Sequence, residues 1–224
     1  MYVSGKELID KFLKASPAER ENLVNELLKD EFKQVLSELS DDEFVSLITS
    51  IPSAKFNEFI EKFEDIISER IKKLNIKSYA RLIDELPGEV RKAFNKKFFV
   101  AMRDFIRDKE IKDILKMLYS VIPPTRSSLL SPWRPVIFSK DFQKKLLNAS
   151  LEDLEAFLST APEDIRRQIL KKHKDLFLSE EFKKKLKEAK TEEIVNLLRW
   201  FPKDLYNEFI QAHKDIFEER GLKL

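Results

Sequence analysis

Prolines recur along the chain at nearly even intervals, and apolar residues keep step with them. The prolines at positions 17, 52, 87, 123, 162 and 202 lie 35 to 40 residues apart. Five residues before these prolines stand Phe12, Leu47, Leu82, Leu118, Phe157 and Leu197. The positions four and eight residues before, and seven after, are also aliphatic or aromatic in every repeat. Because these offsets gather on one face of a helix, the pattern predicts amphipathic helices on both sides of each proline.

Each repeat therefore predicts a helix A that ends before the proline and a helix B that begins with it. Proline suits the first turn of a helix, and it moves the preceding residue out of the α region. Ser40, Ser150 and Thr191 precede acidic residues, so we expect them to be N-caps. Segments that begin at Phe32, Phe142 and Phe182 predict a short third helix. Around 68–75 and 103–109, a simple continuation of helix B is the alternative.

The expected fold is all-α. The chain has only 3 glycines in 224 residues, which gives tight β-hairpins little support. Helical repeats of this length stack into an α-solenoid, because one repeat cannot bury its own apolar face. We expect one domain over residues 1–224, with about six helical-hairpin repeats of 35–40 residues at 4–39, 40–75, 76–109, 110–149, 150–189 and 190–220. This array is similar in general architecture to HEAT and armadillo proteins, which form α-solenoids.

The repeat pattern breaks at residues 122–135, where four prolines fall within fourteen residues. A proline inside a helix costs about 3 kcal/mol. We therefore expect helix B of repeat 4 to shrink to a short turn between Pro124 and Leu130, with an ordered loop after it.

Candidate partner-binding residues lie mainly in this irregular segment. Trp133, Arg134 and Arg126 stand where the repeat is abandoned, and aromatic and arginine side chains often anchor protein interfaces. In the alternative interpretation, Trp133 packs inward within an irregular cap or hinge, because large aromatic side chains are more often buried than displayed. Trp200 is a further candidate, although its position at the end of helix A could bury it against helix B.

The sequence offers little support for catalysis. His173 and His213, the only histidines, lie eleven residues after their prolines, where Phe63 and Phe98 stand in earlier repeats. They are therefore expected to be packing residues with a ring nitrogen on a neighbouring carbonyl or acid, and the alternative is a shared catalytic role. The chain has no cysteine, no glycine-rich phosphate loop and no known nucleophile or zinc motif. We expect no enzyme activity, no cofactor, no metal site and no small-molecule substrate.

Charge is distributed unevenly along the chain. Residues 1–70 carry a net charge of −7, residues 71–138 of +8 and residues 139–224 of +1. A basic stripe over 70–116 could bind phosphates of a nucleic acid. Its candidate residues are Arg70, Lys72, Lys73, Lys77, Lys96, Lys97, Arg103 and Arg107. The alternative is a solvated helical face in which interspersed acids form ion pairs with these residues.

Together these features predict a non-enzymatic module for protein–protein interaction or scaffolding. Self-association is a variant, in which acidic repeats 1 and 2 of one copy meet basic repeats 3 and 4 of another. A nucleic-acid-binding helical-repeat protein is the alternative. We expect a cytoplasmic protein, because the sequence contains neither a membrane span nor a secretory signal. Abundant charge with few glycines also suits a thermophilic source.

Overall fold

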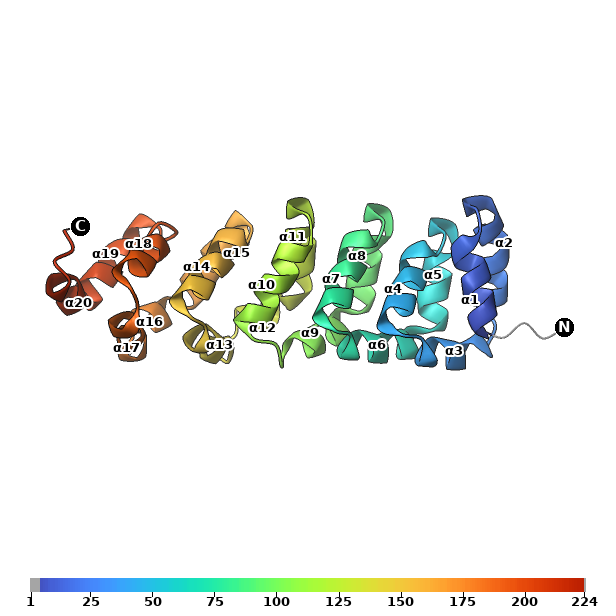
Figure 1. Ribbon diagram of the computed structural model, residues 1–224, viewed down its shortest axis with the longest axis horizontal. Coiled ribbons are helices and arrows are strands. Elements are labelled where there is room, and N and C mark those ends of the chain that lie inside the picture. The colour runs from blue at the N-terminus through green and yellow to red at the C-terminus, as the bar shows by residue number, and fades with distance from the viewer. Residues whose placement is uncertain (1–4, 224) are drawn as a thin grey trace. The chain divides into compact units, whose positions relative to one another are not determined.

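The computed structural model describes residues 5–223, and these residues form helices and connecting turns without a β-strand. The expected all-α fold is thus confirmed (Figure 1). Helix A of successive repeats is α1 (Gly5–Lys14), α4 (Asp41–Ser50), α7 (Ile76–Glu85), α10 (Ile111–Ser120), α14 (Leu151–Thr160) and α18 (Thr191–Leu198). Helix B is α2 (Pro17–Leu27), α5 (Ser53–Lys62), α8 (Gly88–Lys97), α15 (Glu163–Lys172) and α19 (Lys203–Ala212).

A third helical segment follows helix B in every repeat. It is a single helix in the first three repeats, namely α3 (Phe32–Glu38), α6 (Glu64–Lys73) and α9 (Phe99–Ile106). Repeats 4 and 5 have two short helices instead, α12 (Arg134–Ile137) with α13 (Phe142–Asn148) and α16 (Lys174–Phe177) with α17 (Glu180–Glu188), and repeat 6 has α20 (Lys214–Glu219). The third helices predicted from Phe32, Phe142 and Phe182 are confirmed. The continuation of helix B is wrong, because α5 and α8 end before α6 and α9 begin.

The chain divides into two compact units. The N-terminal unit comprises residues up to Asp108 together with Ser120–Pro132, and the C-terminal unit comprises Lys109–Tyr119 and the residues from Trp133 on. Within the N-terminal unit, α4 contacts α1 and α7, α5 contacts α8, and α6 contacts α3 and α9. Within the C-terminal unit, α14 contacts α18, and α17 contacts α13 and α20. Inside each unit, therefore, helices of one type pack on helices of the same type.

The prolines mark the start of helix B, but not always at the same position. Pro52, Pro87, Pro162 and Pro202 are N-cap residues, with φ between −54° and −63° and ψ between 137° and 156°. In repeats 1 and 4 the N-caps are Ser16 and Ile122, so the proline follows as the first helical residue. The expectation of a first-turn proline is therefore wrong by one residue in four repeats. Both positions suit proline, since neither needs its missing N–H.

This shift changes which residues of repeat 4 face the core. The predicted core residue Tyr119 is 61% exposed, whereas its neighbour Leu118 is fully buried. Counted from the N-caps at 16, 52, 87, 122, 162 and 202, the repeats are spaced by 36, 35, 35, 40 and 40 residues. The two longer spacings are those that contain the additional short helices α12 and α16.

The proline-rich segment is helical throughout. It consists of η1 (Pro123–Thr125), α11 (Arg126–Leu130), η2 (Ser131–Trp133) and α12. The predicted short turn between Pro124 and Leu130 is confirmed, but the predicted loop after it is wrong. Each proline occupies one of the first two positions of a short helix, where no intrahelical N–H is required. Among the predicted caps, Ser40 and Ser150 accept hydrogen bonds from the amides of Glu43 and Asp153. Thr191 is instead the first residue of α18.

Four buried residues occupy one equivalent position, the junction between helix B and the third segment. Phe63, Phe98, His173 and His213 have φ between −103° and −116° and ψ between 19° and 26°. The backbone N–H of each still bonds to the carbonyl four residues earlier, which closes helix B before the chain turns. Three of these rings also contact the preceding repeat. The ring centroids lie 6.1 Å apart for Phe63 and Phe32, 6.1 Å apart for His173 and Phe142, and 6.4 Å apart for His213 and Phe182.

The revised register in repeat 4 predicts opposite effects for two neighbouring substitutions. Leu118→Ala should lower the free energy of unfolding by about 2–5 kcal/mol, because it leaves a cavity at a fully buried site. Tyr119→Ala should change it by less than about 0.5 kcal/mol, because that side chain is exposed. Urea denaturation of both variants checks this. Equal losses, or a larger loss at Tyr119, would show that proline and not the N-cap sets the register.

Candidate functional site

Both histidines are fully buried and serve the packing of the third segments. His173 Nε2 lies 2.6 Å from the carbonyl oxygen of Ile137, and His213 Nε2 lies 2.7 Å from that of Phe177. Since a carbonyl oxygen can only accept, Nε2 carries the proton in each ring. The Gln143 side-chain amide, 3.3 Å from His173 Nδ1, then donates to the second ring nitrogen. Both rings are thus packed as predicted, whereas the catalytic alternative requires that they be exposed in one cleft.

Burial also keeps both imidazoles neutral. It lowers the pKa of His173, although the hydrogen bond to Ile137 and the carboxylate of Asp175 act in the opposite direction. Burial lowers the pKa of His213 in the same way, and there the ammonium group of Lys183 adds to the effect. The hydrogen bond to Phe177 and the carboxylates of Asp215 and Glu180 oppose it.

The structure removes Trp133 from the candidate partner-binding residues. Its side chain is fully buried in the C-terminal unit, so the inward-packed alternative is correct. Arg134 forms an ion pair with Asp164 at 3.0 Å and remains partly exposed. Arg126 is half-buried and lies four residues after its N-cap, as do Arg20, Arg91 and Arg166. Those three arginines donate hydrogen bonds to carbonyl oxygens at the end of helix A.

Trp200 is held in a defined position just after α18 and keeps part of its surface exposed. Its indole Nε1 donates a hydrogen bond to Glu155 Oε1 at 2.8 Å. The guanidinium of Arg166 lies over the ring, 4.8 Å from the ring centroid. Arg166 is itself fixed by hydrogen bonds to the carbonyl oxygens of Leu158 and Ala161. We call Trp200, Arg166 and Glu155 the tryptophan cluster.

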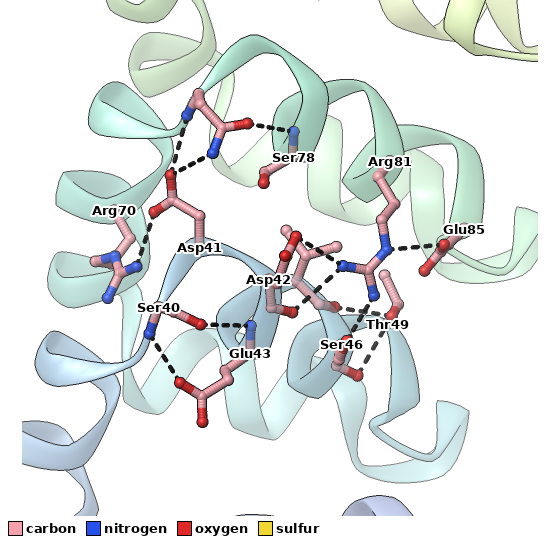
Figure 2. A network of polar contacts seen from close by, with 12 residues as sticks. Ser40, Asp41, Asp42, Glu43, Ser46, Thr49, Arg70, Ser78, Arg81 and Glu85 are labelled. Carbon is pink, nitrogen blue, oxygen red and sulfur yellow. Dashed lines mark hydrogen bonds and ion pairs between the residues drawn. The ribbon is translucent and has the colours of Figure 1, made fainter.

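Arg70, the first phosphate candidate, is a structural residue. Its guanidinium donates to the carbonyl oxygens of Leu36 and Leu39, near the end of α3, and to Asp41 at 3.1 Å. Figure 2 shows the contact between Arg70 and Asp41. Asp41 also accepts two hydrogen bonds from Asn75, the N-cap of α7. In the same network, Arg81 of α7 bonds to Ser46, Asp42 and Glu85. The Arg70 guanidinium therefore joins neighbouring repeats through these contacts.

Four other members of the predicted basic stripe are also occupied. Lys72 pairs with Glu69 and, at 3.9 Å, with Asp104, and Lys97 pairs with Glu64 at 3.6 Å. Arg107 pairs with Asp104, and the guanidinium of Arg103 lies 4.1 Å from the centroid of the Phe99 ring. The remaining candidates, Lys73, Lys77 and Lys96, are exposed. The interspersed-acid alternative thus describes four of the eight candidates, namely Arg70, Lys72, Lys97 and Arg107.

A polar cleft of about 500 Å³ opens in the N-terminal unit and was not predicted. Its lining comes from α8, from Phe99 and from the α11–η2 segment: Gly88, Arg91, Lys92, Asn95, Lys96, Phe99, Ser127, Ser128, Ser131 and Pro132. We call it the α8 cleft. Among its basic residues, Lys96 was a predicted phosphate-binding candidate, whereas Arg91 and Lys92 were not. No sequence motif links these residues to serines more than 30 residues away. Only the fold brings the two segments together.

The neutral histidines predict a loss of stability on acidification. Their unfolded pKa is about 6.5, and the folded values are lower. The unfolded chain therefore binds protons first as the pH falls, and stability decreases below about pH 6.5, by at most about 1.4 kcal/mol per pH unit for each histidine.

Replacing both histidines by phenylalanine, the residue at the equivalent sites Phe63 and Phe98, should remove this dependence. The test is urea denaturation at pH 7.0 and pH 5.5, where few carboxylates titrate. If the double variant His173→Phe/His213→Phe loses as much stability as the parent protein, the histidines do not cause the effect.

Burial of Trp133 predicts a large packing role. Trp133→Ala should lower the free energy of unfolding by about 3–5 kcal/mol, measured by urea denaturation. Trp133→Phe, which retains most of the apolar volume, serves as its control and should lose clearly less. A loss below about 1 kcal/mol for the alanine variant would contradict the buried position.

Within residues 5–223, neither a membrane span nor a metal site adds to these candidates. None of the helices within residues 5–223 has the length and apolarity that a membrane span needs. In the same range, no three side chains of His, Cys, Asp or Glu are placed to share a metal ion. Compared with protein-family models, curated proteins and solved structures, the chain gives no match. Within residues 5–223, the tryptophan cluster and the α8 cleft stand as candidate sites.

Proposed function

We propose that the protein is a non-enzymatic module for protein–protein interaction, and that the tryptophan cluster anchors its partner. A partly exposed Trp beside an Arg is the composition found most often at the energetic centres of interfaces. The hydrogen bond to Glu155 and the stacked guanidinium hold the indole in one orientation. A side chain that is already ordered loses less entropy on binding, which favours its use as an anchor.

We also propose that the repeats form an α-solenoid of the HEAT or armadillo type, with about six repeats of 35–40 residues. Support comes from each compact unit, where helices of one type contact those of the neighbouring repeat. Capping contacts repeat in the same way: Arg70, Lys185 and Arg220 each bond to backbone carbonyls of the preceding third helix. Such arrays bind partners over wide surfaces. A cytoplasmic location is part of this proposal.

Self-association remains a variant of this function. In the N-terminal unit, the exposed side chains of α2 include Glu19, Glu21 and Glu26, whereas those of α8 include Lys92 and Lys96. Copies of the chain could therefore attract one another through these helices, and the association would weaken as salt is added. The concentration dependence of the molecular mass at low and high salt separates self-association from binding of a different protein.

Nucleic-acid binding is the less supported alternative, because most of the basic stripe is engaged within the protein. We expect at most weak binding to duplex DNA or RNA, lost between about 50 and 200 mM salt. Retention on immobilised duplexes across this range measures it. Binding that persists at 200 mM salt would favour the nucleic-acid function over the protein-binding one.

The tryptophan cluster can be tested by two substitutions with different structural costs. Trp200→Ala should abolish partner capture from native extract and lower the free energy of unfolding by only about 1–2 kcal/mol, from the lost hydrogen bond and cation–π contact. Trp200→Phe should retain part of the capture, because it preserves an aromatic anchor.

The control is Arg199→Ala, which changes an exposed neighbour of Trp200 and should leave capture intact. Equal capture by the parent protein and by Trp200→Ala, with both folded by circular dichroism, would exclude the cluster as the anchor. Capture lost by the control as well would mean that the effect is not specific to the indole.

A further inference from the structure

The α8 cleft collects positive charge without a compensating acid. None of its ten lining residues is an aspartate or a glutamate. The nearest acid in sequence, Glu89, accepts a hydrogen bond from the hydroxyl of Ser53 instead. Three other cations of repeat 3 have acidic partners: Arg81 pairs with Glu85, Lys97 with Glu64 and Arg107 with Asp104. The three cations at the cleft, by contrast, share its lining with no acidic side chain.

Three cations contribute to that charge. Arg91 donates to the carbonyl oxygens of Asp84 and Leu86, which are neutral acceptors and leave its charge uncompensated. Lys92 and Lys96 lie one helical turn apart on α8, and both are exposed. Neither forms an ion pair with any side chain in the part of the chain that the structure describes. An anion in the cleft would meet all three groups from one helix.

The opposite wall adds neutral donors. Ser127, Ser128 and Ser131 line the cleft from the α11–η2 segment, and a hydroxyl can donate to any oxygen acceptor. The side-chain amide of Asn95 donates to the backbone carbonyl of Ser128 at 3.4 Å, which ties this wall to α8. Phe99 supplies an apolar surface at the same cleft. A ligand can thus place an anionic group against the cations and hydroxyls and an attached organic group against Phe99.

We propose that the α8 cleft binds a phosphate monoester. A phosphate monoester carries between 1.5 and 2 negative charges near pH 7 and presents three strong acceptor oxygens. The cleft offers three cations and three hydroxyl groups. This set of donors suits the charge and three oxygens of a phosphate better than the single charge and two oxygens of a carboxylate. The volume of about 500 Å³ leaves room for the esterified group beside Phe99. A free phosphorylated metabolite and a phosphorylated side chain of a partner would present the same group, and the proposal does not depend on the tryptophan cluster.

The test is a binding titration of the full chain, followed by backbone amide NMR shifts at constant ionic strength. The probes are inorganic phosphate, ribose 5-phosphate and N-acetyl-O-phosphoserine amide, and the reference is N-acetylserine amide. We expect saturable shifts in α8 and in Ser127–Ser131 with the phosphorylated probes only. Tighter binding of phosphoserine than of ribose 5-phosphate identifies a protein side chain as the source, and the reverse order identifies a metabolite.

Three variants locate the site. Lys92→Gln and Lys96→Gln should each weaken binding about tenfold, because each removes a charge-assisted contact. Gly88→Glu should do the same by placing a carboxylate at the cleft, and a Cβ added at Gly88 would meet no atom within 4 Å. That glutamate would lie in the first turn of α8, where negative charge favours the helix, so the fold should persist.

The matched control is Lys73→Gln/Lys77→Gln, which removes two exposed lysines of the same unit outside the cleft. Its affinity should stay within about twofold of the parent protein, since distant exposed charges are screened. The proposal is overturned if no phosphorylated probe saturates, or if the control weakens binding as much as the cleft variants. Partner capture by Trp200→Ala is measured separately, so failure here leaves the proposed anchor untouched.

Discussion

The junction between helix B and the third segment is the constraint on which the rest of the structure depends. At Phe63, Phe98, His173 and His213 the backbone leaves the α region for one residue, and this turns the chain into the third segment. The same residue places a ring in the core, where it contacts the preceding third helix in the pairs Phe32–Phe63, Phe142–His173 and Phe182–His213. One position thus closes a helix, sets a direction and joins two repeats.

The choice between phenylalanine and histidine at this junction follows from the length of the preceding repeat. The two longer repeats contain α12 and α16. Without the histidines, the last carbonyl oxygens of these helices, at Ile137 and Phe177, would be buried with no hydrogen-bond donor. A histidine Nε2–H supplies that donor, whereas a phenylalanine cannot. The shorter repeats lack the additional helix, and phenylalanine fills the same site. The sequence contained both signals, the longer spacing and the histidines, but only the fold connects them.

Periodicity predicted the helices well because burial of one face is encoded locally in each repeat. Proline could not fix the register to the residue, since it fits an N-cap and a first helical position equally, and Tyr119 was therefore misplaced. Whether the Trp133 side chain is buried or exposed depends on neighbours far away in sequence, so composition alone could not decide it. Trp200 was named as a candidate from the sequence. Its contacts with Glu155 and Arg166 could not be predicted, because these residues lie 45 and 34 positions away. For the α8 cleft, the sequence analysis named only Lys96 among the lining residues, because the serines of the other segment lie more than 30 positions away.

Charge shows most clearly why a list of basic residues is a poor guide to binding. Arg70, Lys185 and Arg220 neutralise helix ends of the preceding repeat, and Lys72, Lys97 and Arg107 pair with acids. A cation that holds one repeat to the next is already desolvated or paired, so it contributes little to the external field. Function must then come from positions where repeats differ from one another. Lys92 and Lys96 at the α8 cleft are such positions, because neither forms an ion pair with another repeat in the described part of the chain. The indole of Trp200 contacts Glu155 and Arg166 of repeat 5, yet part of its surface stays exposed.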